Sequence, residues 1–108
     1  MSATTAEREA PMLAPSVDIF ENDREIRIDA DFPGVTPDAV SVQLEGLELT
    51  LDGRREGPRP SRLRRSFRVP ETIDPDGVDA QLENGVLRVR LPKRDAAVPR
   101  RIEVRAPE

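Results

Sequence analysis

The chain has 108 residues, a net charge of −4 and 35% charged residues, and only 3% of its residues are aromatic. It contains no cysteine and no histidine, which excludes disulfides, Cys/His zinc sites, thiol nucleophiles and His-based catalytic triads. The length fits one domain with one modest core. No stretch approaches the roughly 18 apolar residues of a membrane span. No basic-then-apolar signal opens the sequence, so we expect a cytoplasmic location.

Residues 1–15 are polar and rich in alanine, with two prolines. This composition predicts a short flexible N-terminal arm, in which Met12 and Leu13 form one small apolar spot. The domain proper is expected to cover residues 16–92.

From residue 16 onward, apolar and polar residues alternate with a period of two, which is typical of half-buried strands. The segments with this period are residues 17–20, 26–32, 40–44, 47–51, 63–69, 78–82 and 87–91. Turn signals separate them at intervals of about 8–12 residues. The pattern predicts an all-β fold, an antiparallel-rich immunoglobulin-like β-sandwich of seven to eight short strands.

The turns are marked by proline, glycine and asparagine. Pro33 and Gly34 end one strand, because proline lacks a donor and glycine permits a sharp change of direction. Asn84-Gly85 is the strongest hairpin signal, because both turn positions must tolerate positive φ. Residues 53–60 contain two prolines, two glycines and no apolar residue, and we expect a loop there.

Residues 93–108 are charged and interrupted by proline, which predicts a flexible C-terminal tail. Ile102 and Val104 are two residues apart, so both side chains point the same way in an extended segment. Such a tail can add itself to a groove on another subunit through backbone pairing and two apolar anchors. The alternative is a tail that folds onto its own domain or stays disordered.

Seven arginines fall between Arg54 and Arg68. Clustered positive charge can bind phosphate, but the whole chain is acidic and no aromatic platform for base stacking interleaves the cluster. We favour a solvated strand face and expect no nucleic-acid partner. Arg65 differs, because it lies in the apolar phase between Leu63 and Phe67. It needs a charged partner, or an edge position from which it reaches solvent.

Catalysis has little support in the sequence. The acidic pairs Asp29/Asp31 and Asp74/Asp76 lie where strands and turns prefer polar residues. There is no G-x-x-x-x-G-K-[ST] loop, which excludes ATP hydrolysis by a P-loop. We expect no enzyme activity and no cofactor.

Five segments, in order, carry a family resemblance. They are P-S-V-D-I-F-E at 15–21, D-F-P-G-V at 31–35, S-F-R-V-P at 66–70, A-Q-L-E-N-G-V-L at 80–87 and I-E-V at 102–104. Together they resemble the α-crystallin domain of small heat-shock proteins. The fourth segment, which ends at Leu87, is the most specific, because it fits the pattern A-x-x-x-N-G-V-L at every fixed position.

The resemblance implies an ATP-independent holdase chaperone that binds unfolding client proteins and prevents their aggregation. It also implies a homodimer with Arg65 at the subunit interface, linked into a higher homo-oligomer by Ile102 and Val104. The groove that receives the tail or a client would be lined by six residues of two strands: Val40, Val42, Leu44, Val78, Ala80 and Leu82.

The sequence departs from the family pattern in two places. The segment between Gly53 and Leu63 is too short for the extra strand that bacterial and plant members swap into a partner subunit, and Pro58 and Pro60 disfavour such a strand. The N-terminal arm is also short for the family. These departures keep an alternative open: an accessory small heat-shock protein that forms only dimers, or a non-holdase interaction module similar to CS-type co-chaperones.

Overall fold

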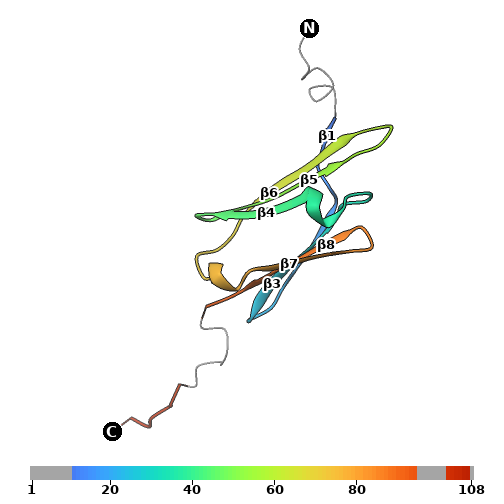
Figure 1. The fold of residues 1–108 in the computed structure, drawn as a ribbon. Helices are drawn as coiled ribbons and strands as arrows, with labels where there is room; N and C mark the ends of the chain where they lie inside the picture. The colour runs from blue at the N-terminus through green and yellow to red at the C-terminus, as the bar shows by residue number, and fades with distance from the viewer. Residues whose placement is uncertain (1–10, 95–101, 108) are drawn as a thin grey trace.

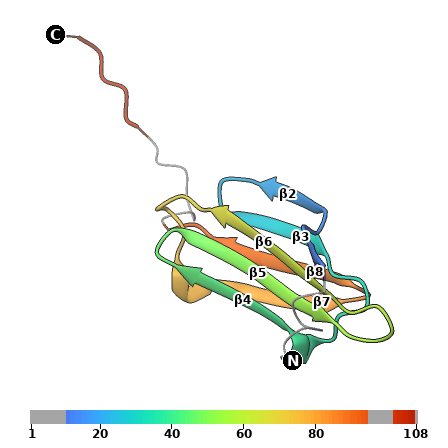
Figure 2. The same ribbon diagram turned by 90° about the horizontal axis from the view of Figure 1, so that it is seen from above.

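Eight short strands form two four-stranded sheets that face each other (Figure 1, Figure 2). The structure is a computed structural model that describes residues 11–94 and 102–107. The strands are β1 (Met12–Leu13), β2 (Val17–Glu21), β3 (Glu25–Asp31), β4 (Val40–Glu45), β5 (Glu48–Arg55), β6 (Ser61–Arg68), β7 (Asp79–Glu83) and β8 (Val86–Pro92). Two single-turn 3-10 helices, η1 (Pro37–Ala39) and η2 (Pro75–Gly77), precede β4 and β7.

The strand order is β1-β6-β5-β4 in the first sheet and β2-β3-β8-β7 in the second. Neighbouring strands pair antiparallel except β1, which runs parallel to β6. The predicted all-β, antiparallel-rich sandwich is therefore confirmed.

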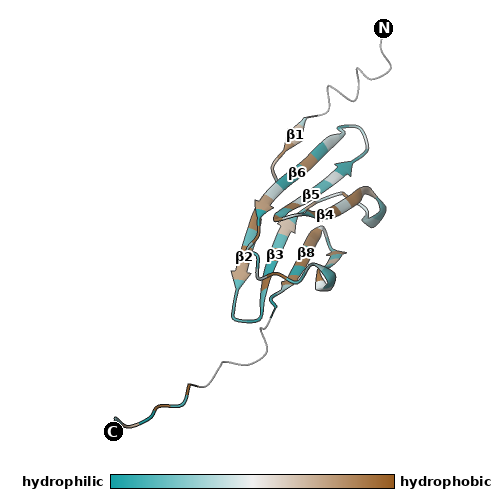
Figure 3. Cartoon of the chain, turned by 90° about the vertical axis from the view of Figure 1, so that its left-hand side faces the viewer, coloured by the Kyte–Doolittle hydropathy of each residue, from teal (hydrophilic) through white to brown (hydrophobic). Residues whose placement is uncertain are grey.

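The core lies between the two sheets and is built from the inward-facing residues of the alternating strands. Along β3 and β8, buried apolar residues alternate with charged residues that face outward, as the hydropathy colours show (Figure 3). The buried apolar residues are Ile26, Ile28, Ala30, Phe32, Val35, Leu49, Leu51, Leu63, Val69, Ile73, Leu87, Val89 and Leu91. Burial of this apolar surface away from water makes the largest favourable contribution to the packing of the two sheets.

Two residues of the expected N-terminal arm belong to a sheet. Met12 pairs with Arg62 and Leu13 with Leu63, and the backbone N–H of Arg62 donates to the carbonyl of Pro11 at 2.9 Å. A two-residue strand held by backbone hydrogen bonds has no side-chain period, so the alternation pattern could not reveal it. The first ten residues lie outside the described part of the chain.

The loop predicted for residues 53–60 is shorter than expected, because β5 continues to Arg55. Gly53 is buried in this extension and pairs with Leu63. An added Cβ at position 53 would lie only 2.7 Å from Cδ2 of Phe32, so glycine here permits a close approach of the Phe32 ring. The prediction was wrong because this glycine supports packing inside a strand. The remaining loop, residues 56–60, contains no strand.

The two predicted turn motifs contact each other. Asn84 and Gly85 have φ angles of 53° and 77°, and Gly34 has a φ angle of 76°, so the chain adopts the left-handed conformations that these residues tolerate. The backbone N–H of Phe32 donates to the carbonyl of Gly85 at 2.7 Å. The corner after β3 is thereby joined to the β7–β8 hairpin, and Leu87, two residues after Gly85, lies in the core.

We predict that Gly53→Ala lowers the free energy of unfolding by about 1–3 kcal/mol, because the new methyl group overpacks the site against Phe32. Urea unfolding measures the change. In a Phe32→Leu background, which removes the ring atoms that would clash, the same substitution should cost clearly less. Equal costs in the two backgrounds would contradict the packing explanation.

Candidate functional site at the sandwich edges

The two strands predicted to form a groove, β4 and β7, are the edge strands of the two sheets on the same side of the sandwich (Figure 2). On β4, the inward-facing residues Val40, Val42 and Leu44 are only half-buried, although Val42 and Leu44 pair with the fully buried Leu51 and Leu49. An edge strand has a neighbour on one side only, which leaves part of its apolar face uncovered.

The apolar residues along β7, in the opposite sheet, are likewise only partly covered. Val78, which immediately precedes the strand, and Leu82 are half-buried and pack against the core. Ala80 pairs with the buried Val89 yet is itself exposed. The structure thus places the six predicted groove residues on two edges that share one side of the molecule, with apolar surface open to solvent.

The tail motif has large apolar side chains in solvent. Ile102 is 79% exposed and Val104 is 90% exposed, and the segment that holds them is drawn in red in Figure 1. Residues 95–101, which connect it to the domain, lie outside the described residues. The two residues are spaced so that an extended backbone presents both to one surface.

Arg65 has a partner within its own chain. Its guanidinium donates to the carbonyl of Pro15 at 3.0 Å, and it lies 5.5 Å from the centre of the Phe67 ring. Pro15 is buried in the crossing between β1 and β2, so Arg65 connects the first sheet to the start of β2. The interface role of Arg65 stays a prediction.

The side of the sandwich opposite β4 and β7 has an apolar feature that the sequence did not indicate. Ile19 and Phe20 on edge strand β2 are 54% and 48% exposed, and the Arg27 guanidinium lies 4.4 Å from the centre of the Phe20 ring. The alternation predicted an inward-facing Ile19. It could not show that the facing sheet leaves this part of β2 uncovered.

Two members of the arginine cluster, Arg62 and Arg64, form ion pairs with Asp52 on the outer face of the first sheet. Arg62 donates to both carboxylate oxygens of Asp52, at 3.2 and 2.8 Å, and Arg64 lies 3.5 Å from the same group. The hydrogen bond from Arg62, supported by the charges of Arg62 and Arg64, lowers the pKa of Asp52, and partial burial opposes this shift. This pairing fits the interpretation of a solvated strand face.

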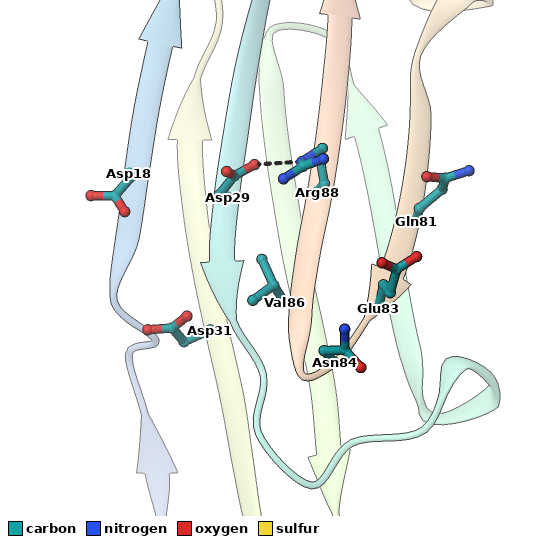
Figure 4. A pocket seen from close by; sticks show the side chains of 8 residues that line it. All are labelled: Asp18, Asp29, Asp31, Gln81, Glu83, Asn84, Val86 and Arg88. Carbon is teal, nitrogen blue, oxygen red and sulfur yellow. Dashed lines mark hydrogen bonds and ion pairs between the residues drawn. The ribbon is translucent and has the colours of Figure 1, made fainter.

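The outer face of the second sheet holds a pocket lined mainly by polar side chains (Figure 4). Asp29 accepts from Arg88 at 3.2 Å and lies 3.4 Å from Arg27. This carboxylate is therefore part of an ion-pair network.

Asp74 likewise has a structural role, because it accepts a hydrogen bond from the backbone N–H of Asp76 at the start of η2. In the described ranges, no three histidine, cysteine or acidic residues are arranged to hold a metal ion.

Among the residues that the structure describes, no helix is both long enough and apolar enough to cross a membrane.

Comparison with known proteins assigns the chain to a class. The model of the Hsp20/alpha crystallin family matches residues 18–105, so the chain belongs to that family. Members of this family are small heat-shock chaperones, which act without ATP and are in general not enzymes. They form oligomers and bind unfolded clients.

Individual relatives agree in sequence and in structure. A probable 15 kDa heat shock protein of Leptospira interrogans is 34% identical over 97% of this chain and 88% of its own length. Spore protein SP21 of Stigmatella aurantiaca is 33% identical, and the match covers 87% of this chain and 63% of that protein. The crystal structure of hspA from Xanthomonas axonopodis has a TM-score of 0.70 at 34% identity, and covers 78% of this chain and 97% of that one.

We predict that Asp52→Asn lowers the free energy of unfolding at neutral pH by about 1 kcal/mol, because the pair is partly exposed and screened. The pKa of Asp52 is lowered in the folded chain, so the stabilisation is fully present above the unfolded pKa of about 4 and is lost as the pH falls below it. The difference between the two chains should therefore shrink in acid. Urea unfolding between pH 7 and 3 measures it.

Glu56→Gln, which changes an exposed carboxylate in the neighbouring loop, is the matched control. A stability difference for Asp52→Asn that stays constant across this pH range would contradict the ion-pair explanation.

Proposed function

We propose that this protein is an ATP-independent holdase that binds exposed apolar segments of unfolding proteins and keeps them from aggregating. The observation that carries the proposal is the pair of edge strands β4 and β7, with half-buried or exposed apolar side chains on one side of the sandwich. Family membership supports a chaperone role for the protein. The cytoplasmic location remains a prediction from the sequence.

The mechanism is a competition governed by mass action. An unfolding protein exposes apolar segments that associate with one another, and a complementary apolar edge captures such a segment before a second client molecule does. An extended segment also gains backbone hydrogen bonds at a free strand edge. The outer faces, which carry charged residues such as Arg64 and Arg88, keep the complex in solution. None of these steps requires nucleotide or covalent chemistry.

The tail is proposed to use the same side of a neighbouring subunit. Ile102 and Val104 are almost fully exposed and suit the apolar margin formed by β4 and β7. Burying both contributes roughly 3–5 kcal/mol before ordering costs, which is consistent with reversible assembly. Tail and client would then compete for one surface. A related small heat-shock protein from Xylella fastidiosa, 33% identical over 85% of this chain, is described as having a distinct high order structure.

One observation favours a second candidate, an accessory member that forms only dimers. Residues 56–60 contain no strand, so the connection between β5 and β6 has no element to exchange with a partner subunit. Such a member would modulate the assemblies of other small heat-shock proteins, and would give little protection to clients by itself. A client-protection assay separates the two functions.

We predict that an equimolar amount of this chain suppresses light scattering from a heated, aggregation-prone protein. Ala80→Glu should weaken this protection several-fold, because it adds a charge to the exposed apolar face of β7. Gln81→Glu adds the same charge to the exposed outer face of the same strand and should leave protection intact. Thermal unfolding of each chain confirms that it is folded at the assay temperature.

A folded chain that leaves client aggregation unchanged would rule out the holdase function and favour the accessory one. Equal effects of Ala80→Glu and Gln81→Glu would place client binding away from this face of β7.

For self-assembly, we predict that the double substitution of Ile102 and Val104 by serine reduces the mass of the assembled species, because it removes both apolar anchors. Sedimentation velocity measures the change. Serine substitutions at Glu103 and Arg105 serve as controls of the same length in the same segment and should leave the mass unchanged. An unaltered sedimentation profile for the Ile102/Val104 variant would remove the tail from the assembly.

A further inference from the structure

Strand β2 ends the second sheet with one side unpaired. The strand order β2-β3-β8-β7 gives it a neighbour only in β3, and β2 stands at the margin of the sheet in Figure 3. Ile19 and Phe20 at its centre are 54% and 48% exposed. A free strand edge that also exposes large apolar side chains readily pairs with another strand. Among the described residues, no strand pairs with the open side of β2, so this side is available to another molecule.

The hydrogen-bonding phase of β2 shows which backbone groups are free. The N–H of Asn22 donates to the carbonyl of Glu25 at 3.0 Å, and the N–H of Asp31 donates to the carbonyl of Ser16 at 2.9 Å. Because hydrogen-bonded and non-bonded pairs alternate along an antiparallel ladder, the even-numbered residues of β2 bond to β3. The N–H and C=O groups of the odd-numbered residues, Val17, Ile19 and Glu21, point to the open side.

We propose that a second copy of this chain pairs with that edge, β2 antiparallel to β2, with the two-fold axis at Ile19. Each sheet β2-β3-β8-β7 would then continue into that of its partner. The proposal rests on the edge geometry of β2, and it requires neither holdase activity nor docking of the C-terminal tail.

The register follows from backbone and charge together. With the axis at Ile19, Val17 lies opposite Glu21 of the partner subunit, and the free groups at positions 17, 19 and 21 face one another across the junction. Asp18 lies opposite Phe20 of the partner subunit. Within each chain, the Arg27 guanidinium lies over the Phe20 ring, 4.4 Å from its centre. The carboxylate of one chain thereby approaches the guanidinium of the other, and two-fold symmetry makes this contact twice.

Shifting the axis to Asp18 would oppose two aspartates directly, which is unfavourable in a cross-strand pair. Shifting it to Phe20 would pair Ile19 with Glu21 of the partner subunit and leave Val17 without a strand residue opposite it. The register centred on Ile19 engages every free backbone group of β2 and opposes no like charges. This self-complementarity is the reason that we assign the edge to a second copy and not to an unrelated chain.

Cysteine cross-linking tests the register directly, because the native sequence has no cysteine. Ile19→Cys should form a disulfide-linked dimer on mild oxidation, because directly opposed residues in a hydrogen-bonded pair have Cα atoms about 5.5 Å apart, within disulfide range. Asp18→Cys alone and Phe20→Cys alone should not link. A mixture of these two variants should link, because positions 18 and 20 oppose each other across the junction.

A proline substitution tests the backbone pairing. Ile19→Pro removes an N–H that makes no bond to β3, so the single chain should keep its fold, as edge strands tolerate proline at such positions. It should raise the dissociation constant of the dimer at least tenfold, measured by native mass spectrometry over a dilution series. Ile19→Ala keeps the N–H and should weaken the dimer less.

Efficient linking of Phe20→Cys alone, or absence of linking at position 19, would overturn the proposal. So would an unchanged dissociation constant for a folded Ile19→Pro chain. The cross-linking result stands by itself if the proline variant does not fold. These outcomes are independent of client protection, so the dimer and the holdase function can fail separately.

Discussion

The proposed functions depend on one constraint: the edge strands of an open sandwich have backbone groups without a neighbouring strand and apolar side chains that are only partly covered. Two four-stranded sheets bury one face each, and neither sheet closes into a barrel. Strands β2, β4 and β7 therefore each have a neighbour on one side only, and their inward-facing apolar residues are only partly covered. Backbone groups and apolar side chains at a free edge favour addition of another extended segment. The proposed client, the tail of a neighbour and a second β2 strand all meet this same physical requirement.

The core residues stabilise the fold, and the edge residues are the ones proposed to bind partners. Phe32, Leu49 and Leu87 are fully or almost fully buried, and they hold the sheets together whether or not a partner is present. The edge residues contribute less to the core and remain available for binding. Several acidic side chains have structural roles: Asp29 and Asp52 make ion pairs, and Asp74 supports a turn.

The sequence predicted the elements whose side chains alternate, and it failed where backbone geometry decides. Inward-facing residues such as Ile28 and Val89 define the strands and the sandwich through their period alone. The parallel pairing of Met12 and Leu13 with β6 depends on backbone hydrogen bonds, and the extension of β5 through Gly53 depends on the approach of a distant ring. Neither leaves a local pattern.

The site was predictable to a different degree. The spacing of apolar residues predicted the strands that form β4 and β7 and marked the tail motif. Only the family resemblance implied that the two strands form one groove, and the role of that groove stays a prediction. The exposure of Ile19 depends on how far one sheet extends over the other, and the contact of Arg65 with Pro15 joins residues 50 positions apart. Both follow from the packing of whole sheets. Alternation in a single strand carries no information about either.

Hydrogen–deuterium exchange with mass spectrometry tests the central claim, that one apolar side of the sandwich serves both tail and client. The full chain would be measured alone, with a peptide of residues 100–107, and with an unfolding client protein. The account predicts that peptide and client each slow exchange in β4 and β7, and that the two compete. Protection of different strands by peptide and client, or unchanged exchange in β4 and β7, would contradict it.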